Sequence, residues 1–448
     1  MFRRRLILAF TMIVIAAILF FNIKAKRDRQ AALSGSPNIL VILVDALRRD
    51  HLGAYGYDLP ISPNLDELAE DSIVFENAFA QSHSTFLSVP SLFTSLFPLE
   101  AAKKTLGFFS LREEVVTLAE RLSRAGYLNA AFSVNAFVHP DYGFSQGFNT
   151  FFQKNDIVAE ELTDEMLSWL EKHPRRPFFI YMHYMDPHSP YTPPEEFRAK
   201  FVPQDYRPPR KIISRARCRD LKRLMRVGFE FREEDQAFIK ALYDAEIASA
   251  DRHIGRMLER LRQMDLYDDT VILLLADHGE EFWDHGDLEH GRTLYDEIIR
   301  VPLLLKLPAS AGRKGERVSD IVELLDVHPT LMELTGLPPT PGIRGKSLLE
   351  VDSSEHRWGY AEALGIRTLR EDGWKLIDKP DPDQDELYNL KEDPAETRNL
   401  IAKHPKIAIK LRSHMVDLTQ VEEPPKAEAY KPLDPKTEKR LRALGYID

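Results

Sequence analysis

Cysteine is scarce in this sequence, and basic residues are outnumbered by acidic ones. The single cysteine, Cys218, cannot form a disulfide bond within the chain, so stability must come from a packed core or from bound metal. The 60 Lys and Arg residues stand against 70 Asp and Glu, which gives a formal net charge of −10. A chain with this balance does not attract polyanions in general, and we expect no nucleic acid among its partners. The sequence also lacks internal repeats.

Long uncharged hydrophobic runs are rare too, and the clearest one lies at the N-terminus. Residues Leu6 to Phe21 carry no charge and lie between the basic clusters 3–5 and 24–29. The run is long enough to cross a bilayer or to form the apolar part of a signal peptide. The basic residues after it and the poor cleavage site favour an uncleaved anchor over a removed signal. We therefore expect residues 1–30 to form a single-pass membrane anchor.

Beyond a short linker, apolar runs alternate with helical patterns. Runs without polar alternation are typical of strands buried on both faces, which predicts an α/β fold with a mainly parallel central sheet flanked by helices. The expected helices include 62–71 and 115–126, the second closed by Gly126. The expected strands are Asn38 to Asp45, Tyr127 to Val134, Phe178 to Tyr184, Thr270 to Asp277 and Val301 to Leu307.

The pattern changes near residue 350. Short segments rich in strand formers follow one another from residue 358 to residue 390, and Asp372-Gly373 is a strong signal for a tight hairpin. We expect a catalytic domain over residues 36–345 and a smaller C-terminal subdomain with an antiparallel sheet over residues 346–448.

Two of the expected parallel strands end in polar residues with metal-binding side chains. Asp45 ends the first strand, and Asp277 and His278 end another. Because ligands bind beyond the carboxyl ends of the strands in open α/β sheets, these side chains should meet at one edge. Two carboxylates and one imidazole predict one divalent cation, with Ca²⁺ favoured, Mg²⁺ or Mn²⁺ possible and Zn²⁺ less suitable.

Ser88 lies in a stretch, SHSTFLSVPSLFTSLFP (82–98), that mixes hydroxyl and large apolar side chains. Pro90 suits the first turn of a helix, where its missing N–H has no cost. This spacing predicts that Ser88 lies at or just before the helix start, where free N–H groups favour an anion. Close to a dication, its hydroxyl could act as a nucleophile and metal ligand. The alternative is that Ser88 only caps the helix.

Several histidines fall in loops expected at the same edge of the sheet. His188 follows a strand in a proline-rich loop and is a candidate general acid, and His290 is a second candidate. His183, inside the strand, is more typical of a structural hydrogen-bonding histidine.

Basic residues do gather in one segment, 207–226, which holds nine Lys or Arg against one Asp. The simpler interpretation is a solvated helical insertion with a basic face. The alternative is contact with anionic lipid headgroups or with an anionic substrate.

Taken together, these segments resemble the sulfatase family of the alkaline-phosphatase superfamily. The resemblance runs from about residue 36 to the C-terminus through PNILVILVDALRRDHLGAYGY, SVPSLFTSLFP, RPFFIYMHYMDPHSPY, DDTVILLLADHGEEFWDHG, HGRTLYDEIIRVPLLLKLP and ELYNLKEDPAETRNL. It implies the family's α/β fold and a catalytic domain outside the cytoplasm. It also implies site roles: metal ligands at Asp45, Asp277 and His278, the nucleophile at Ser88, the leaving-group acid at His188 and oxyanion binding at His290.

The chain departs from the family pattern at three places. Asp45 is followed by Ala46 where many members have a second Asp, and Asn135 stands where many have a Lys and His segment. The signature of members that oxidise their nucleophile to formylglycine ends in Arg, but here Leu92 follows Ser88 in that place. We therefore predict that Ser88 stays unmodified.

The resemblance predicts a metal-dependent hydrolase that cleaves a sulfate ester outside the cytoplasm. An alternative is a phosphodiesterase, a phosphonate hydrolase or a transferase of phosphoglycerol or phosphoethanolamine that uses unmodified Ser88, so the expected substrate is a sulfate or phosphate ester. A second alternative is a catalytically silent binding protein.

Overall fold

This computed structural model describes residues 35–419, except 106–107, 156, 174–176, 214–215 and 352–356. The expected membrane anchor, residues 1–30, and the end of the C-terminal region, after residue 419, lie outside the described residues. Among those that are described, no helix is both long and apolar enough to cross a bilayer.

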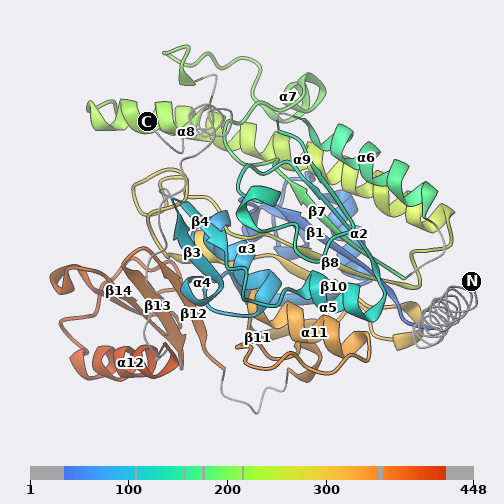
Figure 1. Ribbon diagram of the computed structural model, residues 1–448. Coiled ribbons are helices and arrows are strands. Elements are labelled where there is room, and N and C mark those ends of the chain that lie inside the picture. Colours follow the sequence, from blue (N-terminus) through green and yellow to red (C-terminus); the bar gives the residue numbers. More distant parts are fainter. Residues whose placement is uncertain are drawn as a thin grey trace, which may run out of the picture.

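A mainly parallel sheet of nine strands forms the centre of the described chain (Figure 1), as the sequence predicts. β1 pairs in parallel with β7 on one side and with β8 on the other, and β10 pairs antiparallel with β8 and β2. The short β9 (Arg300–Val301) pairs with β2 off the main path. Along that path the order is β11 (Arg317–Glu323), β2 (Ile73–Phe79), β10 (Leu303–Lys306), β8 (Thr270–Leu275), β1 (Asn38–Val44), β7 (Phe178–Tyr184), β5 (Leu128–Ser133) and β6 (Thr150–Gln153).

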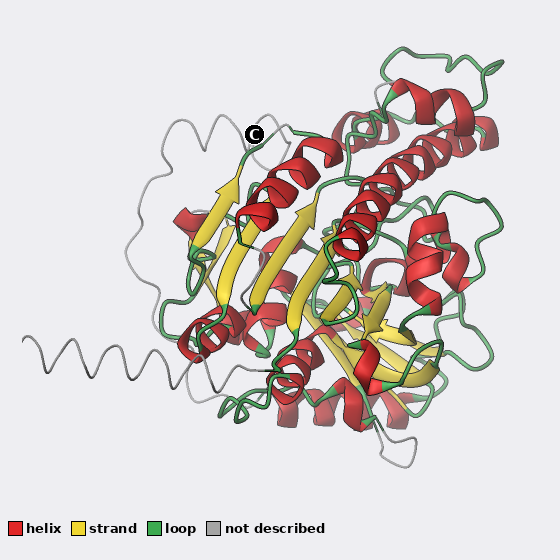
Figure 2. Cartoon of the chain, turned by 90° about the vertical axis from the view of Figure 1, so that its right-hand side faces the viewer, coloured by secondary structure: helices red, strands yellow, loops and turns green. Residues whose placement is uncertain are grey.

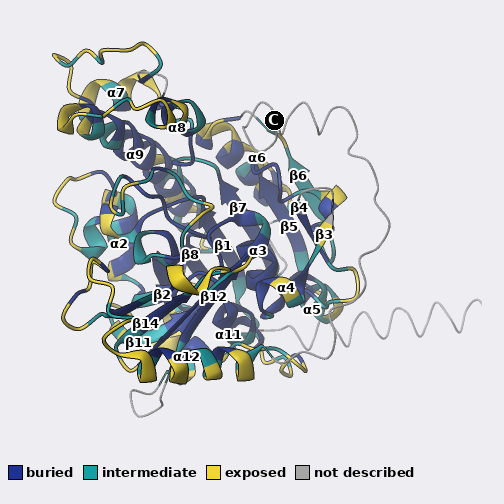
Figure 3. Ribbon diagram, turned by 90° about the vertical axis from the view of Figure 1, so that its left-hand side faces the viewer, coloured by how far each residue is buried: buried dark blue, intermediate teal, exposed yellow. Residues whose placement is uncertain are grey.

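Helices cover both faces of this sheet (Figures 1 and 2). One layer contains the long helix α9 (Glu233–Gln263), against which α2 (Pro63–Glu70), α6 (Ala159–Lys172) and α7 (Glu195–Phe201) pack. The other contains α3 (Thr85–Thr94), which contacts α5 (Leu118–Ala125) and α11 (Val327–Leu334). The strands between the layers are the most buried part of the chain (Figure 3), since every residue of β7 and β8 is buried. Shorter elements are α4 (Pro98–Ala101), α8 (Cys218–Arg226), α10 (Asp296–Ile299) and the hairpin β3 (Ala102–Thr105) and β4 (Phe108–Leu111).

A four-stranded antiparallel sheet follows beside β2 and β11, which confirms the expected C-terminal sheet. Its strands are β12 (Gly359–Ala363), β13 (Ile366–Glu371), β14 (Trp374–Asp378) and β15 (Glu386–Asn389), and α12 (Pro405–Leu418) packs on β13 and β14. The hairpin between β13 and β14 turns at Asp372 and Gly373, with φ of 56° and 80°. Positive φ at both positions is the geometry that an Asp-Gly hairpin favours.

Candidate active site

The ends of β1 and β8 bring Asp45, Asp277 and His278 together. One ligand atom from each lies within 4.8 Å of the others, and all three residues are buried. The Nε2 atom of His278 lies 3.6 Å from Asp45 Oδ1 and 3.6 Å from Asp277 Oδ2. Because β1 and β8 are adjacent parallel strands in register up to Leu43 and Leu275, the residues just past their ends must meet at one edge.

The chemistry of these three groups fits a cation. Asp45 Oδ1 and both carboxylate oxygens of Asp277 are buried and accept no hydrogen bond from a described residue. Buried carboxylate oxygens without donors are costly, so a bound cation is the partner that such a group requires. His278 donates from Nδ1 to the carbonyl of Gly279 at 2.9 Å, which leaves the lone pair of Nε2 facing the carboxylates. Burial lowers the pKa of His278, which favours the neutral ring that a metal ligand needs.

Asp45 is held in place by its other oxygen. Oδ2 accepts hydrogen bonds from Asn135 Nδ2 at 2.5 Å and from His183 Nε2 at 3.0 Å, and His183 Nδ1 lies 2.9 Å from the hydroxyl of Tyr181. Burial favours the neutral acid, but the charge of His188 and the hydrogen bond of His183 outweigh it and hold the pKa of Asp45 below its usual range. His183 is thus a structural hydrogen-bonding residue, as the sequence indicates.

The helix that carries Ser88 begins earlier than the sequence predicts. α3 has Ser84 as its N-cap and Thr85 as its first residue, so Ser88 is the fourth residue and Pro90 the sixth. The backbone N–H of Ser88 already donates to the carbonyl of Ser84 at 2.9 Å, and its side-chain hydroxyl is buried without a hydrogen-bond partner in the described chain. The prediction that Ser88 lies at the helix start is therefore wrong. Packing explains the difference, because α3 is buried from Leu87 to Thr94 and tolerates the hydrogen bond lost at Pro90.

Thr85, and not Ser88, lies at the start of α3 beside the predicted metal ligands. Its hydroxyl oxygen lies 3.4 Å from His278 Nε2 and 3.4 Å from Asn135 Nδ2. As the first residue of a ten-residue helix, it also lies where backbone N–H groups lack helical acceptors and the helix dipole favours negative charge. Neither Thr85 nor Asn135 is among the predicted site residues. The pair Ser84-Thr85 could have indicated this start, since Ser is as good an N-cap at residue 84 as at residue 88.

Three residues just before Thr85 leave polar atoms without partners. Ser82 Oγ, His83 Nδ1 and Ser84 Oγ are buried and form no hydrogen bond with any described residue, and the hydroxyl of Ser84 does not cap α3. Burial and the nearby rings of His290 and His278 lower the pKa of His83 to about 3, so its ring is neutral. Unsatisfied donors next to a helix N-terminus can be satisfied by the oxygens of a bound anion.

His290 and His188 lie beside the same group. The centroid of the His290 ring lies 4.2 Å from the centroid of the His278 ring and 4.9 Å from that of the His188 ring. Glu280 accepts a hydrogen bond from His290 Nδ1 at 2.9 Å and another from the hydroxyl of Tyr191 at 2.9 Å. Burial disfavours the charged ring, but the negative charge of Glu280 outweighs it and raises the pKa of His290 to about 9. His188 donates from Nδ1 to the carbonyl of Ser189 at 2.7 Å, which fixes the orientation of its ring.

The structure thus brings together five of the six predicted site residues, namely Asp45, His188, Asp277, His278 and His290, with Thr85 in place of Ser88. Two carboxylates, several imidazoles and a hydroxyl at a helix N-terminus thus lie together at the carboxyl edge of a mainly parallel sheet, a set of groups that fits a cation beside an anion. This fold and site define a hydrolase of the alkaline-phosphatase-like superfamily.

Comparisons with known proteins make the family specific. A family model described as Sulfatase matches residues 37–337, and one described as N-sulphoglucosamine sulphohydrolase, C-terminal, matches residues 284–421. The chain belongs to the sulfatase family, and it is a sulfatase-family hydrolase.

Individual relatives agree with this assignment. The arylsulfatase of Clostridium perfringens is 25% identical over 446 residues, which cover 82% of this chain and 90% of the relative. Iduronate 2-sulfatase of Mus musculus is 27% identical over 390 residues, which cover 68% of this chain and 69% of the relative. The crystal structure of phosphonate monoester hydrolase of Agrobacterium radiobacter shares the fold with a TM-score of 0.70 at 20% identity, covering 85% of this chain and 95% of that one.

Proposed function

We propose that this sulfatase-family hydrolase cleaves a sulfate ester with Thr85 as its nucleophile and a divalent cation at Asp45, Asp277 and His278. The observation that carries this proposal is the position of Thr85, whose hydroxyl lies 3.4 Å from His278 Nε2 at the first residue of α3. Polar atoms of Ser82, His83 and Ser84 that have no hydrogen-bond partner among the described residues lie directly before it in the chain.

Asp45 Oδ1, the Asp277 carboxylate and His278 Nε2 are the atoms that would hold the cation. Oxygen ligands with one imidazole suit Ca²⁺, Mg²⁺ or Mn²⁺ better than Zn²⁺. A dication bound there would stabilise negative charge on the ester oxygens and on the hydroxyl of the nucleophile.

Three residues have separate roles in the proposed reaction: a nucleophile, a general acid and a group that binds an ester oxygen. Thr85 Oγ1 gives its proton to a water molecule and bonds to the sulfur of the ester while the bond from sulfur to the leaving oxygen breaks. His188 gives a proton to that leaving oxygen. Cationic His290, held by Glu280 at 2.9 Å, binds an oxygen of the sulfuryl group. Water then attacks the sulfate ester of Thr85, which releases sulfate and restores the hydroxyl.

A second candidate substrate is a phosphodiester or phosphonate. The specific observation in its favour is again Thr85, because oxidation of a threonine side chain would give a ketone and not the aldehyde of formylglycine. The resemblance associates an unmodified Thr or Ser with the members of the superfamily that transfer phosphoryl groups. The same attack by Thr85 and the same acid, His188, would serve a phosphorus centre.

We also propose that the catalytic domain lies outside the cytoplasm, attached through residues 1–30. The uncharged run from Leu6 to Phe21 supports a membrane anchor. The basic residues on its two sides nearly balance, so the outward orientation of the domain rests on the resemblance to the sulfatase family. Protease added to cells whose outer wall has been opened should digest the catalytic domain. Protection of the domain until the inner membrane is lysed would reverse the proposed topology.

The test of the nucleophile compares Thr85→Ala with Ser88→Ala on an aryl sulfate and on the matching aryl phosphodiester. We expect Thr85→Ala to lower kcat/KM by about a thousandfold or more on whichever ester the wild type cleaves. Ser88→Ala serves as the matched control and should keep most of the activity. Loss of activity in Ser88→Ala alone would restore Ser88 as the nucleophile, and absence of turnover in the wild type on both esters would favour a binding protein.

A further inference from the structure

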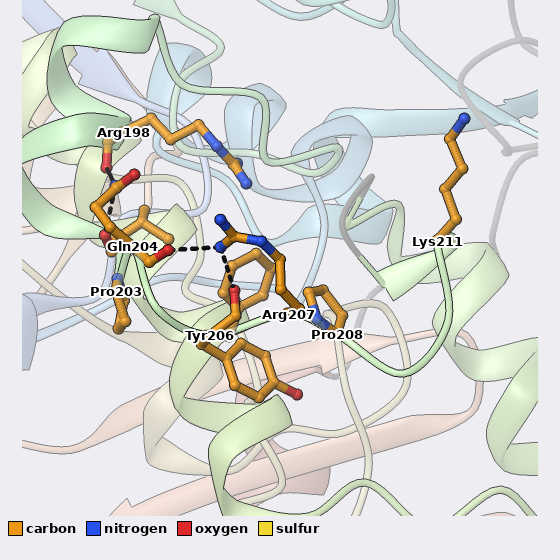
Figure 4. Close-up of a pocket in the computed structure, with 9 residues that line it drawn as sticks. Arg198, Pro203, Gln204, Tyr206, Arg207, Pro208 and Lys211 are labelled. Atoms are coloured by element: carbon orange, nitrogen blue, oxygen red, sulfur yellow. Dashed lines mark hydrogen bonds between the residues drawn. The ribbon is translucent and has the colours of Figure 1, made fainter.

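A cavity of about 350 Å³ lies between α7, the segment that follows it and α9 (Figure 4). Arg198, Gln204, Tyr206, Arg207, Lys211 and Phe238 are among the residues that line it. None of the residues of the candidate active site lines it, so this cavity is a separate feature of the basic region of the chain.

Two arginines line this cavity, Arg198 partly exposed and Arg207 exposed. The guanidinium groups of Arg198 and Arg207 point toward one another, whereas the side chain of Lys211 points away (Figure 4). Arg207 is fixed in this direction, because its Nη1 donates to the carbonyls of Gln204 at 2.5 Å and of Tyr206 at 2.9 Å. Arg198 comes from α7 and lies with its Cζ 5.6 Å from the centroid of the Phe238 ring. Two cationic groups that point toward one another are stabilised when an anion lies between them.

No such anion is supplied by the described part of the chain. Neither Arg198 nor Arg207 forms an ion pair with a described carboxylate, although nearby arginines do. Arg232 pairs with Asp235 at 3.2 Å, and Arg252 pairs with Glu196 on α7 at 2.5 Å.

The wall of the cavity is aromatic, and the nearby carboxylate of Asp235 is already hydrogen-bonded to other residues. The rings of Tyr206 and Phe238 lie 5.3 Å apart, and the Tyr206 hydroxyl donates to Asp235. Because Asp235 also accepts a hydrogen bond from the side chain of Arg232, its charge is compensated outside the arginine pair. The cavity therefore presents two planar guanidinium donors above an apolar surface.

We propose that this cavity is a binding site for a phosphate or sulfate group, held between Arg198 and Arg207. Guanidinium groups bind tetrahedral oxyanions through paired N–H donors, and the fixed direction of Arg207 reduces the entropy lost on binding. The group can be a free inorganic anion or the headgroup of an anionic phospholipid, since both present the same oxygens. The site goes beyond the proposed esterase function and does not depend on it.

Binding of labelled inorganic phosphate to the full-length protein, measured by equilibrium dialysis, tests the proposal. At saturation the wild type should bind one phosphate more per chain than Arg198→Gln/Arg207→Gln, and any phosphate held at the catalytic centre is common to both. Lys200→Gln/Arg223→Gln removes the same charge at exposed positions of α7 and α8 and is the matched control. It should bind as the wild type does. Equal phosphate binding by the wild type and both double variants would overturn the proposal, and so would an equal loss in the control.

A second measurement identifies the source of the group. Full-length protein is sedimented with vesicles of phosphatidylcholine alone or mixed with phosphatidylglycerol, and the basic residues of 1–30 contribute the same preference for phosphatidylglycerol in every variant. A lipid-headgroup site requires Arg198→Gln/Arg207→Gln to lower the preference for phosphatidylglycerol while the control keeps the wild-type preference. An unchanged preference together with lost phosphate binding assigns the site to a free anion.

Arg207→Lys keeps the charge but not the planar donors, so it should weaken phosphate binding by about tenfold without changing the unfolding midpoint. Wild-type affinity in this variant would contradict the proposed geometry.

Discussion

Lys222 of α8 forms an ion pair with Glu289, the residue that precedes His290 in the active site. Lys222 Nζ lies 2.9 Å from Glu289 Oε2, and the side chain of Lys222 is only 8% exposed. Glu289 has a φ of 72°, in the left-handed region that residues other than glycine seldom occupy. The basic segment expected to form a helical insertion over 207–226 contains the helix α8 at residues 218–226, and one of its cations is buried against Glu289 and not exposed to solvent.

The first prediction follows from this contact. Lys222→Met removes the ion pair that holds Glu289 in its left-handed conformation, and we expect His290 to lose its fixed position. Because His290 is proposed to bind the ester's oxyanion, KM should rise more than kcat falls, with kcat/KM lower by about tenfold. Steady-state kinetics checks this split.

Two variants serve as controls for Lys222→Met. Lys222→Arg retains a cation at the same place and should restore most of the KM. Arg223→Met changes an exposed neighbour on the same helix and should change neither constant. A lower unfolding midpoint for Lys222→Met with unaltered KM would show that the ion pair is structural only.

The second prediction concerns the cation. Asp277→Asn keeps the shape of the side chain but removes a carboxylate that has no donor in the described chain, so the purified protein should lose its bound metal and its turnover. Elemental analysis of the two proteins measures this loss. Asp287→Asn, a partly exposed carboxylate of the same loop region, should retain the metal. Equal metal in Asp277→Asn and the wild type would show that the site is wrongly assigned.

The third prediction is a pH dependence of stability. His285 Nδ1 lies 2.6 Å from Glu297 Oε1, and the ring stacks on Tyr295 with centroids 3.6 Å apart. Burial disfavours the charged ring, but the hydrogen bond and charge of Glu297 outweigh it and raise the pKa of His285 from 6.5 to about 9. A raised pKa means that the folded state binds the proton more tightly, so this stabilisation is complete below about pH 6.5 and is lost as the pH rises through about 9.

The unfolding free energies of the wild type and His285→Gln, measured by urea unfolding, should therefore differ most at pH 6 and converge near pH 10. The difference at pH 6 should be on the order of 1 to 3 kcal/mol. Glu297→Gln removes the cause of the shift and should show a smaller pH dependence over the same range. A constant difference between wild type and His285→Gln at all pH values would contradict the assignment.

The sequence predicts the centre of the sheet better than its margins, for a physical reason. β1, β5, β7, β8 and β10 are buried on both faces, so each is a continuous apolar run that can be read directly. The strands β6 and β11 lie at the two edges, are partly exposed and contain polar residues, and they are not among the expected strands. The strand β2, next to β11, is also missed, because the partly exposed Glu76 and Asn77 interrupt its apolar run.

The site shows a similar division. Asp45, Asp277 and His278 follow from strand ends, because neighbouring parallel strands deliver their last residues to one edge. Thr85 depends on where α3 begins, and Ser84 and Ser88 are equally good N-caps, so the position of Pro90 favours the wrong one. Asn135 contacts Asp45, 90 residues away, and Glu280 contacts Tyr191, 89 residues away, and no local pattern in the sequence predicts such contacts.

The last prediction concerns the ionic contact that joins the C-terminal sheet to the catalytic part of the chain. Lys375 of β14 is completely buried, and its Nζ lies 2.9 Å from Asp296 Oδ1 on α10 and 2.6 Å from Glu396 Oε1. Lys375→Met leaves these two carboxylates with less compensation in a buried place, which should cost about 3 to 5 kcal/mol of unfolding free energy. Urea unfolding monitored by tryptophan fluorescence measures the change, and Lys410→Met, which removes an exposed ion pair with Asp372 at 3.0 Å, should show little or none.

The pH dependence of the Lys375 variant separates loss of charge compensation from loss of packing. Burial raises the pKa of Glu396 to about 7 even with Lys375 present. Without that cation the pKa of Glu396 should rise further, so lowering the pH protonates the carboxyl and removes the unpaired buried charge. The destabilisation by Lys375→Met should therefore be smaller at pH 5.5 than at pH 8, and adding Glu396→Gln should recover part of the loss at pH 8. A destabilisation that is equal at both pH values and unaffected by Glu396→Gln would mean that Lys375 stabilises the fold through the packing of its aliphatic chain.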